Sequence, residues 1–284
     1  MLSLSLAILS SASLALIFRV TEARGYRRLA VTFGNYVTAT ITALALLWIE
    51  RGAFNSAPSV DPWVVLAVGI PGGLLFFTGF LLYQRAVAFH GPGLAGMYGK
   101  LGVLVPMVLS MLVWREYPAT VQVLGMLLAV AAIVVSQRAP AGGRTGGGFM
   151  RPLLLAQLLV MGFAEFSNKV WEYYGGIAGR SSFLALLFAV AMVAAGATLA
   201  HRGSRPTGVE LRWGIAVGVP NLFSSFFLIS ALDQLPAAVV FPAFSAGAIV
   251  VIALGAWAMY GDRLSPRQWA AIALTAVALV LINR

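Results

Sequence analysis

Long apolar runs separated by short polar segments are the main pattern of the chain. A membrane-spanning helix needs about 20 mostly apolar residues to cross about 30 Å of hydrocarbon. Ten runs meet this requirement: Leu2–Val20, Leu29–Ile49, Trp63–Phe89, Leu94–Val113, Ala119–Gln137, Leu153–Tyr173, Ser182–Ala200, Trp213–Leu232, Ala237–Tyr260 and Arg267–Asn283. The runs are continuous and do not alternate as barrel strands do. The pattern therefore predicts an all-α integral membrane protein with ten transmembrane helices.

The connections between these runs are short, for example His90–Gly93 and Asp233–Pro236. Short connections make consecutive spans antiparallel neighbours, so we expect a compact helix bundle. The first run, Met1–Phe18, has no basic residues before it and no A-x-A site followed by a soluble domain. We interpret it as the first span and not as a cleaved signal peptide.

The two halves of the chain resemble each other. A shift of 146 residues places Phe80–Gln137 over Phe226–Asn283, Glu116 over Asp262 and Gln122 over Gln268. A shift of 150 residues places Arg19–Glu22 over Lys169–Glu172. An odd number of spans in each half gives the halves opposite orientations. The matches therefore predict two inverted five-helix repeats, a frequent transporter architecture with its site near the membrane midplane.

The predicted domain organisation follows these repeats. Residues 1–137 form the first five-helix repeat and residues 153–284 form the second. Residues 138–152 form the linker between them, because the glycine-rich tract Gly142–Gly148 is typical of a flexible connection and does not lie between a strand and a helix.

Composition supports the membrane assignment and excludes several functions. Of the residues, 60% are hydrophobic and 10% are charged, against roughly 25% charged in soluble domains. The mean hydropathy is +0.91. The absence of cysteine excludes disulfides, thiolate metal sites and cysteine nucleophiles. The net charge of +10 is better explained by arginines that orient the spans than by nucleic acid, because no long basic run is present.

Two motifs resemble a known family. The sequence W-R-E-Y-P-A-T-V-Q at residues 114–122 ends the first repeat, and Y-G-D-R-L-S-P-R-Q-W at residues 260–269 ends the second. These motifs and the ten-span repeat resemble the drug/metabolite transporter superfamily, EamA-like type, whose G-E-R-L-S-P-x-Q-W pattern has Glu where this chain has Asp262. The resemblance implies a central cavity built by spans one, three, four, six, eight and nine. The K-V-W-E run at residues 169–172 resembles the first helix of the small multidrug resistance family.

The orientation of the chain has two conflicting indications. Twelve arginines lie in the connections that follow odd-numbered spans, and four lie in the other connections and at the termini. The positive-inside rule therefore places both termini outside the cell. The family resemblance implies that both termini are inside.

Ionisable residues deep in a span point to a functional site, because each costs a few kcal/mol in lipid. Span six carries a polar stripe, since Gln157, Glu165, Asn168, Lys169 and Glu172 fall within about 120° of arc at 100° per residue. The i,i+4 spacing of Glu165 and Lys169 allows an ion pair between them. That pair could stabilise the bundle, or its carboxyl could take up a proton near the midplane.

Lys100 lies among the glycines of Gly93–Gly102, which recur every three residues. The glycines are explained by close helix packing alone, but the lysine is not. Lys100 needs an anionic partner, which could be Glu165, a substrate carboxylate or phosphate, or a lipid headgroup. We therefore expect it to contact the cavity.

The remaining candidates each have a structural alternative. Gln84 and Arg85 near the end of span three could bind substrate, or Arg85 could extend to the membrane surface. Asn221, Ser224 and Ser225 follow Pro220 and could satisfy its freed carbonyl or line a cavity. Residues Asn35, Thr38 and Thr42 favour bonds between helices. The final candidates, suited to an aromatic wall or to ordinary packing, are Tyr98, Phe241, Pro242, Phe244 and Ser245.

The sequence has no H-E-x-x-H, G-x-S-x-G, phosphate-loop or clustered-carboxylate motif. We therefore expect no catalytic residue, metal or cofactor, and transport driven by an ion gradient or by the substrate's own gradient. The predicted function is export of a small metabolite, such as an amino acid or a related zwitterion or anion, through the bacterial plasma membrane. Expected partners are this substrate, protons and lipid, with no nucleic acid, in a monomer or homodimer. A lipid flippase is the alternative, and an integral membrane enzyme is the third class.

Overall fold

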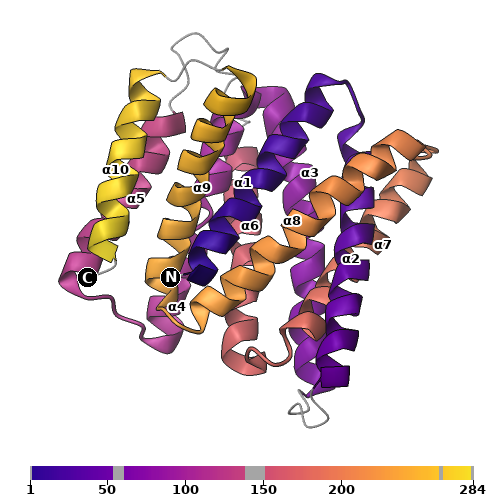
Figure 1. Cartoon of the computed structure of the whole chain (residues 1–284), viewed down its shortest axis with the longest axis horizontal. Coiled ribbons are helices and arrows are strands. Elements are labelled where there is room, and N and C mark those ends of the chain that lie inside the picture. The colour runs from indigo at the N-terminus through magenta and orange to yellow at the C-terminus, as the bar shows by residue number, and fades with distance from the viewer. Residues whose placement is uncertain (1, 54–60, 138–150, 262–264, 283–284) are drawn as a thin grey trace. The chain divides into compact units, whose positions relative to one another are not determined.

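The computed structural model describes residues 2–53, 61–137, 151–261 and 265–282, and in these ranges the regular secondary structure is α-helical (Figure 1). Ten helices are described, which agrees with the predicted number of apolar elements. They are α1 (Leu2–Ala23), α2 (Arg28–Ala53), α3 (Pro62–Leu101), α4 (Leu104–Trp114), α5 (Thr120–Gln137), α6 (Arg151–Gly175), α7 (Arg180–His201), α8 (Gly208–Leu232), α9 (Ala237–Tyr260) and α10 (Pro266–Ile282).

Seven segments of these described helices are long and apolar enough to cross a membrane. They lie in α1, α2, α3, α6, α7, α8 and α9. The other apolar helical segments are shorter, at 10–17 residues, and one of them is Pro266–Ile282. At 1.5 Å per residue, 17 residues reach about 26 Å, slightly less than the hydrocarbon thickness. The prediction of ten spans, and of their inverted orientation, therefore stays a prediction.

The break predicted at His90–Gly93 is wrong, because α3 continues through this segment to Leu101. The interruption comes instead at Gly102 and Val103, after which α4 begins. Glycine lowers helix propensity without forcing a turn, and a backbone in lipid must satisfy its own hydrogen bonds. Continuing the helix through the glycines keeps these bonds except at Pro92, which has no backbone N–H.

The chain divides into two compact units. Unit 1 contains residues 1–77 and 167–233, so it holds α1, α2, α7, α8, the first part of α3 and the last part of α6. Helix α2 packs against α7 and α8. The contact with α8 is close, since a Cβ atom added at Gly214 would lie 2.5 Å from the Cα of Gly34. Small residues thus set the spacing of this pair, as is common between membrane helices.

Unit 2 contains residues 78–166 and 234–284, and so holds α4, α5, α9, α10, the rest of α3 and the first part of α6. The last helices of the two sequence halves, α5 and α10, pack against each other. A Cβ atom added at Gly125 would lie 2.9 Å from the carbonyl oxygen of Ala278. Residues 237–249 of α9 are buried on all sides, as expected of a helix that is hydrophobic all round.

Each unit draws helices from both halves of the sequence. The predicted repeats 1–137 and 153–284 are therefore not the compact units, although they can still be related in sequence. Most of the predicted linker 138–152 lies outside the described residues, and its last two residues, Arg151 and Pro152, begin α6.

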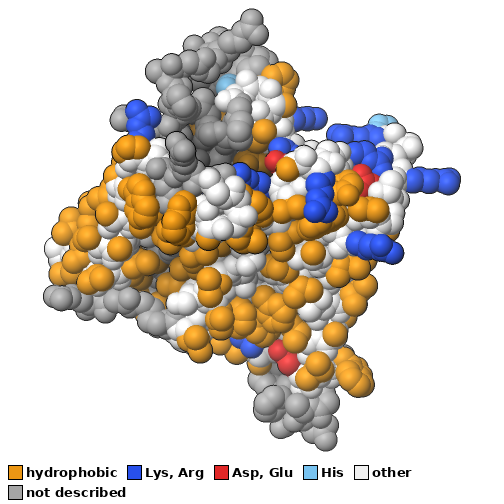
Figure 2. All heavy atoms as spheres, turned by 45° about the horizontal axis from the view of Figure 1, so that its top comes forward, with side chains coloured by type: hydrophobic (Ala, Val, Ile, Leu, Met, Phe, Trp, Pro, Cys, Tyr) orange, Lys and Arg blue, Asp and Glu red, His pale blue; other side chains and the backbone are white. Residues whose placement is uncertain are grey.

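Hydrophobic side chains cover much of the surface that faces the viewer in Figure 2, and charged side chains are confined to a few places. Exposed residues include Leu2, Ile41, Trp48 and Trp63, of which Trp48 is 79% exposed. Apolar surface this extensive is stable in contact with lipid chains and not in water. The predicted lipid environment thus has a counterpart on the described surface.

Candidate functional site

The end of α3 and the first half of α6 approach each other closely in unit 2. A Cβ atom added at Gly162 of α6 would lie 2.5 Å from the carbonyl oxygen of Gly102, and one at Gly99 would lie 2.9 Å from the Nε2 atom of Gln157. The Gln157 amide donates a 2.7 Å hydrogen bond to the carbonyl of Ala95. The glycines at 99 and 102 therefore serve the close helix approach that their spacing predicts.

Lys100 and Glu165 are brought together by this contact between α3 and α6. Lys100 is partly exposed, and Glu165 is the charged group that acts electrostatically on its ammonium. Within the described part of the chain, Lys100 forms no hydrogen bond and no ion pair shorter than 4.0 Å. The two opposite charges thus attract each other.

The other candidates of unit 2 differ in their surroundings. Gln84 has a buried Nε2 atom with no hydrogen-bond partner among the described residues, whereas its neighbour Arg85 is exposed. Tyr98 packs on the small apolar cluster formed by Ala86, Ala95 and Leu154. Both aromatic candidates of α9 are buried, which ordinary packing explains equally well: Phe241 and Phe244.

The candidates of unit 1 lie on α6 and α8. Lys169 is 2% exposed and forms an ion pair with Glu172, three residues along α6. The ion pair that the sequence spacing allows between Lys169 and Glu165 stays a prediction. Asn168 is fully buried. The amide of Asn221 donates a 3.1 Å hydrogen bond to Asn35 of α2, so this pair links two helices.

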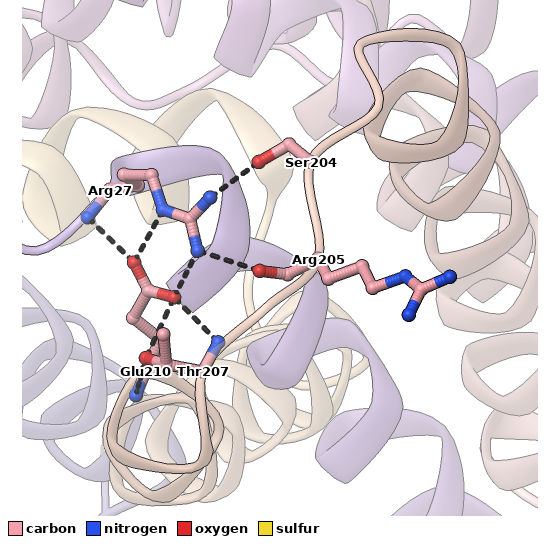
Figure 3. Close-up of polar contacts among 5 residues, drawn as sticks. All are labelled: Arg27, Ser204, Arg205, Thr207 and Glu210. Atoms are coloured by element: carbon pink, nitrogen blue, oxygen red, sulfur yellow. Dashed lines mark hydrogen bonds and ion pairs between the residues drawn. The ribbon is translucent and has the colours of Figure 1, made fainter.

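Sequence reasoning missed an ion-pair network at one end of unit 1 (Figure 3). Both oxygens of Glu210 accept hydrogen bonds from Arg27, through the backbone nitrogen, Nε and Nη2. The same carboxylate accepts from the backbone nitrogen and hydroxyl of Thr207, which caps α8. Arg27 also donates to Ser204 and to the carbonyl of Arg205.

This network raises the pKa of the Arg27 guanidinium, chiefly through its hydrogen bond to Glu210. Burial opposes the change less strongly. A signal for the network was available, because a Thr three residues before a Glu is a capping box. The long-range partner Arg27, 183 residues away, has no local signal.

Glutamine and glutamate side chains accept hydrogen bonds from backbone nitrogens at the starts of helices, and the two glutamines occupy equivalent positions in the two halves. Gln122 accepts a hydrogen bond from the backbone nitrogen of Ala119, and Gln268 accepts one from Ser265. These pairs correspond at the shift of 146 residues. Glu116 accepts a 2.8 Å bond from the backbone nitrogen of Ala237, the first residue of α9. Its repeat partner, Asp262, lies outside the described residues.

No group of three His, Cys, Asp or Glu side chains suited to a metal ion occurs in the residues that the structure describes. Seven segments of the described helices are long and apolar enough to cross a membrane, which supports a multi-pass integral membrane protein.

Residues 1–137 match the model of the EamA-like transporter family, part of the drug/metabolite transporter superfamily. The resemblance expected from the two motifs is thereby confirmed over the first half of the chain.

Two further similarities cover nearly the whole chain. An uncharacterized protein of Haemophilus influenzae is 22% identical over 274 residues, which are 95% of this chain and 93% of that protein. A protein known from its crystal structure matches 100% of this chain and 97% of its own, with 20% identity and a TM-score of 0.79. The second similarity shows that the fold is one already seen in a crystal.

Proposed function

We propose that the chain is a secondary transporter that exports a small metabolite with an anionic group, such as an amino acid, across the bacterial plasma membrane. The matching family consists of transporters, which supports transport over catalysis. The observation that supports the substrate class is Lys100, an ammonium in unit 2 on which Glu165 acts electrostatically.

The physical argument starts from the cost of charge in a membrane protein. A lysine inside a bundle is retained at a cost of a few kcal/mol, so it is expected to have a partner. A carboxylate or phosphate of the substrate would supply this partner directly. Glu165 nearby would then attract the ammonium group of a zwitterionic amino acid, or take up a proton when an anion enters and neutralises Lys100. This arrangement favours a zwitterion or anion over a bare cation.

Counterflow measures this function. The purified full chain is placed in proteoliposomes loaded with one unlabelled amino acid, and uptake of the same labelled amino acid is followed for each member of a panel. We expect at least one amino acid or organic anion to exchange faster than in protein-free liposomes. The compound that exchanges should also raise the unfolding temperature of the purified chain when the same panel is tested by thermal shift, since binding stabilises the folded state.

Substitutions then test the site. Lys100→Met should lower counterflow at least tenfold while the protein stays folded, and Lys100→Arg should keep part of the activity. Arg85→Met is the matched control, because Arg85 is exposed on the same helix. Counterflow at the wild-type rate in Lys100→Met would remove the lysine from the site.

A further inference from the structure

A cluster of arginines occupies one end of unit 1, where α1 ends, α2 begins, α7 ends and α8 begins. The network of Figure 3 holds these four helix ends together, because Arg27 before α2 binds Glu210 of α8 and the chain after α7. We call this region the arginine end. Its six arginines are Arg24, Arg27, Arg28, Arg202, Arg205 and Arg212.

Both acidic side chains at this end form ion pairs with arginines. The two acids there, Glu22 and Glu210, form ion pairs with Arg28 and Arg27. Six arginines and two acids leave a net charge of +4. The other four arginines are exposed: Arg24, Arg202, Arg205 and Arg212. Figure 2 shows Lys and Arg side chains gathered in its upper right part.

The opposite end of unit 1 has the reverse charge. There α2 and α8 end, α3 and α7 begin, and α6 reaches its last turn. Arg180 of α7 is attracted by both Glu50 of α2 and Asp233 after α8, which shows that these ends meet. Four acids and three basic residues, including Lys169 that pairs with Glu172, give this end a net charge of −1: Glu50, Asp61, Glu172, Asp233, Arg51, Lys169 and Arg180. The charges therefore separate along the unit.

Exposed apolar residues lie beside the arginine end, as is typical of a protein segment at a membrane surface. On α8, exposed Val209, Leu211 and Ile215 flank Arg212. The guanidinium of Arg24 lies 5.1 Å from the ring centroid of Trp213. Tryptophan and arginine together at the end of an apolar helix are typical of the headgroup region, where the ring and the charge each find a suitable medium.

We propose that the arginine end of unit 1 binds the phosphate of anionic phospholipid headgroups in the cytoplasmic leaflet. Arginine is suited to phosphate, because its planar guanidinium can donate two parallel hydrogen bonds. The adjacent apolar surface gives the lipid chains a place beside the bound headgroup, which a soluble phosphate does not need. The same proposal places this end in the cytoplasm and the acidic end outside.

The proposal is tested by titrating the full chain in neutral detergent with lipids and measuring the bound lipid by native mass spectrometry. Phosphatidylglycerol should bind more tightly than phosphatidylcholine. Each arginine near an anionic surface adds about fivefold in affinity, so Arg202→Gln/Arg205→Gln/Arg212→Gln should weaken phosphatidylglycerol on the order of a hundredfold. Replacing the same three residues with Lys keeps the charge and should retain most of the binding.

Several results would overturn the proposal. One is equal binding of the two lipids, and another is unchanged phosphatidylglycerol affinity in the glutamine triple variant. Competition by inorganic phosphate at micromolar concentration would instead assign the site to a soluble anion. None of these three arginines belongs to the substrate site proposed above, so counterflow in a fixed lipid mixture should persist in the folded variant.

Cysteine labelling gives a second readout of the same proposal, because the chain has no cysteine of its own. Ala23→Cys at the arginine end and Ala178→Cys at the acidic end both lie at exposed positions. An impermeant maleimide added to intact cells should label Ala178→Cys and leave Ala23→Cys unlabelled until the cells are opened. The reverse pattern would place the arginine end outside and overturn the proposal.

Discussion

Glu210 and Glu165 are both held near a cation, but in different ways. Glu210 is 3% exposed, and each of its oxygens accepts hydrogen bonds from Arg27 or Thr207. Glu165 acts electrostatically on Lys100 of α3. A saturated carboxylate holds helices in place, because any change of partner breaks several bonds at once. We therefore expect a structural role for Glu210 and propose a transport role for Glu165.

The largest effect is expected for Glu210→Ala. It removes several charge-assisted hydrogen bonds and part of the cap of α8, so the free energy of unfolding should fall by about 3 kcal/mol. Chemical unfolding followed by tryptophan fluorescence measures this change. Glu165→Gln, measured in the same way, should change it by less than about 1 kcal/mol, because Gln keeps the size of the side chain and can still form hydrogen bonds. Similar losses in both variants would abolish the distinction between the two glutamates.

The contact between α3 and α6 provides the next test. Gly162→Ala would place a Cβ atom 2.5 Å from the Gly102 carbonyl oxygen and 2.6 Å from Val105, so the helices must separate. Overpacking of this kind costs about 1–3 kcal/mol. Counterflow should fall as well, because Lys100 moves away from Glu165. Gly208→Ala is the control, since nothing lies within 4 Å of its added Cβ atom; an equal loss there would remove packing as the cause.

Glu165→Gln should separate transport from folding more sharply. If Glu165 carries a coupling proton, accumulation of substrate against its gradient should fall at least tenfold. That factor corresponds to about 1.4 kcal/mol of driving force. Exchange across equal pH on both sides should survive, because it needs no net proton movement. Both activities are measured in the same proteoliposomes, and accumulation at the wild-type level would exclude the coupling role.

The smallest effect concerns the two glutamines that begin α5 and α10. Both accept a hydrogen bond from the backbone nitrogen three residues earlier. Gln122→Ala and Gln268→Ala should each lower the free energy of unfolding by about 1 kcal/mol, as loss of a cap does. Near-equal losses would agree with equivalent positions in two repeats. A loss in only one of the variants would show that the sequence match has no energetic counterpart.

Local sequence patterns predicted much of this structure. The apolar runs predicted the helices, and the glycine spacing around Lys100 predicted a close helix contact, because both depend on neighbouring residues. The continuation of α3 through residues 90–93 was missed, since glycine permits a turn without requiring one. The ion pair between Lys169 and Glu172 was not predicted, because spacings of three and four residues are equally available on a helix.

Contacts between distant segments could not be read from the sequence. The Arg27–Glu210 pair joins residues 183 positions apart, and neither residue differs in type from other loop charges. Asn35 and Asn221 were both selected as polar residues in spans, but their mutual hydrogen bond depends on how α2 packs on α8. The approach of Glu165 to Lys100 was one of three partners considered, and only the packing of α3 on α6 selects it.

The interleaving of the two units has a consequence for synthesis in the cell. Unit 1 ends at Asp233 and unit 2 includes residues up to 284, so neither is complete when the first half of the chain has been made. The hydrogen bond between Glu116 and the backbone nitrogen of Ala237 can form only after Ala237 is made, 121 residues later. At about 5–20 residues per second this delay is roughly 6–24 s. During that time the nascent helices sit in the bilayer without their final neighbours, so membrane insertion and tertiary assembly are necessarily successive events for this protein.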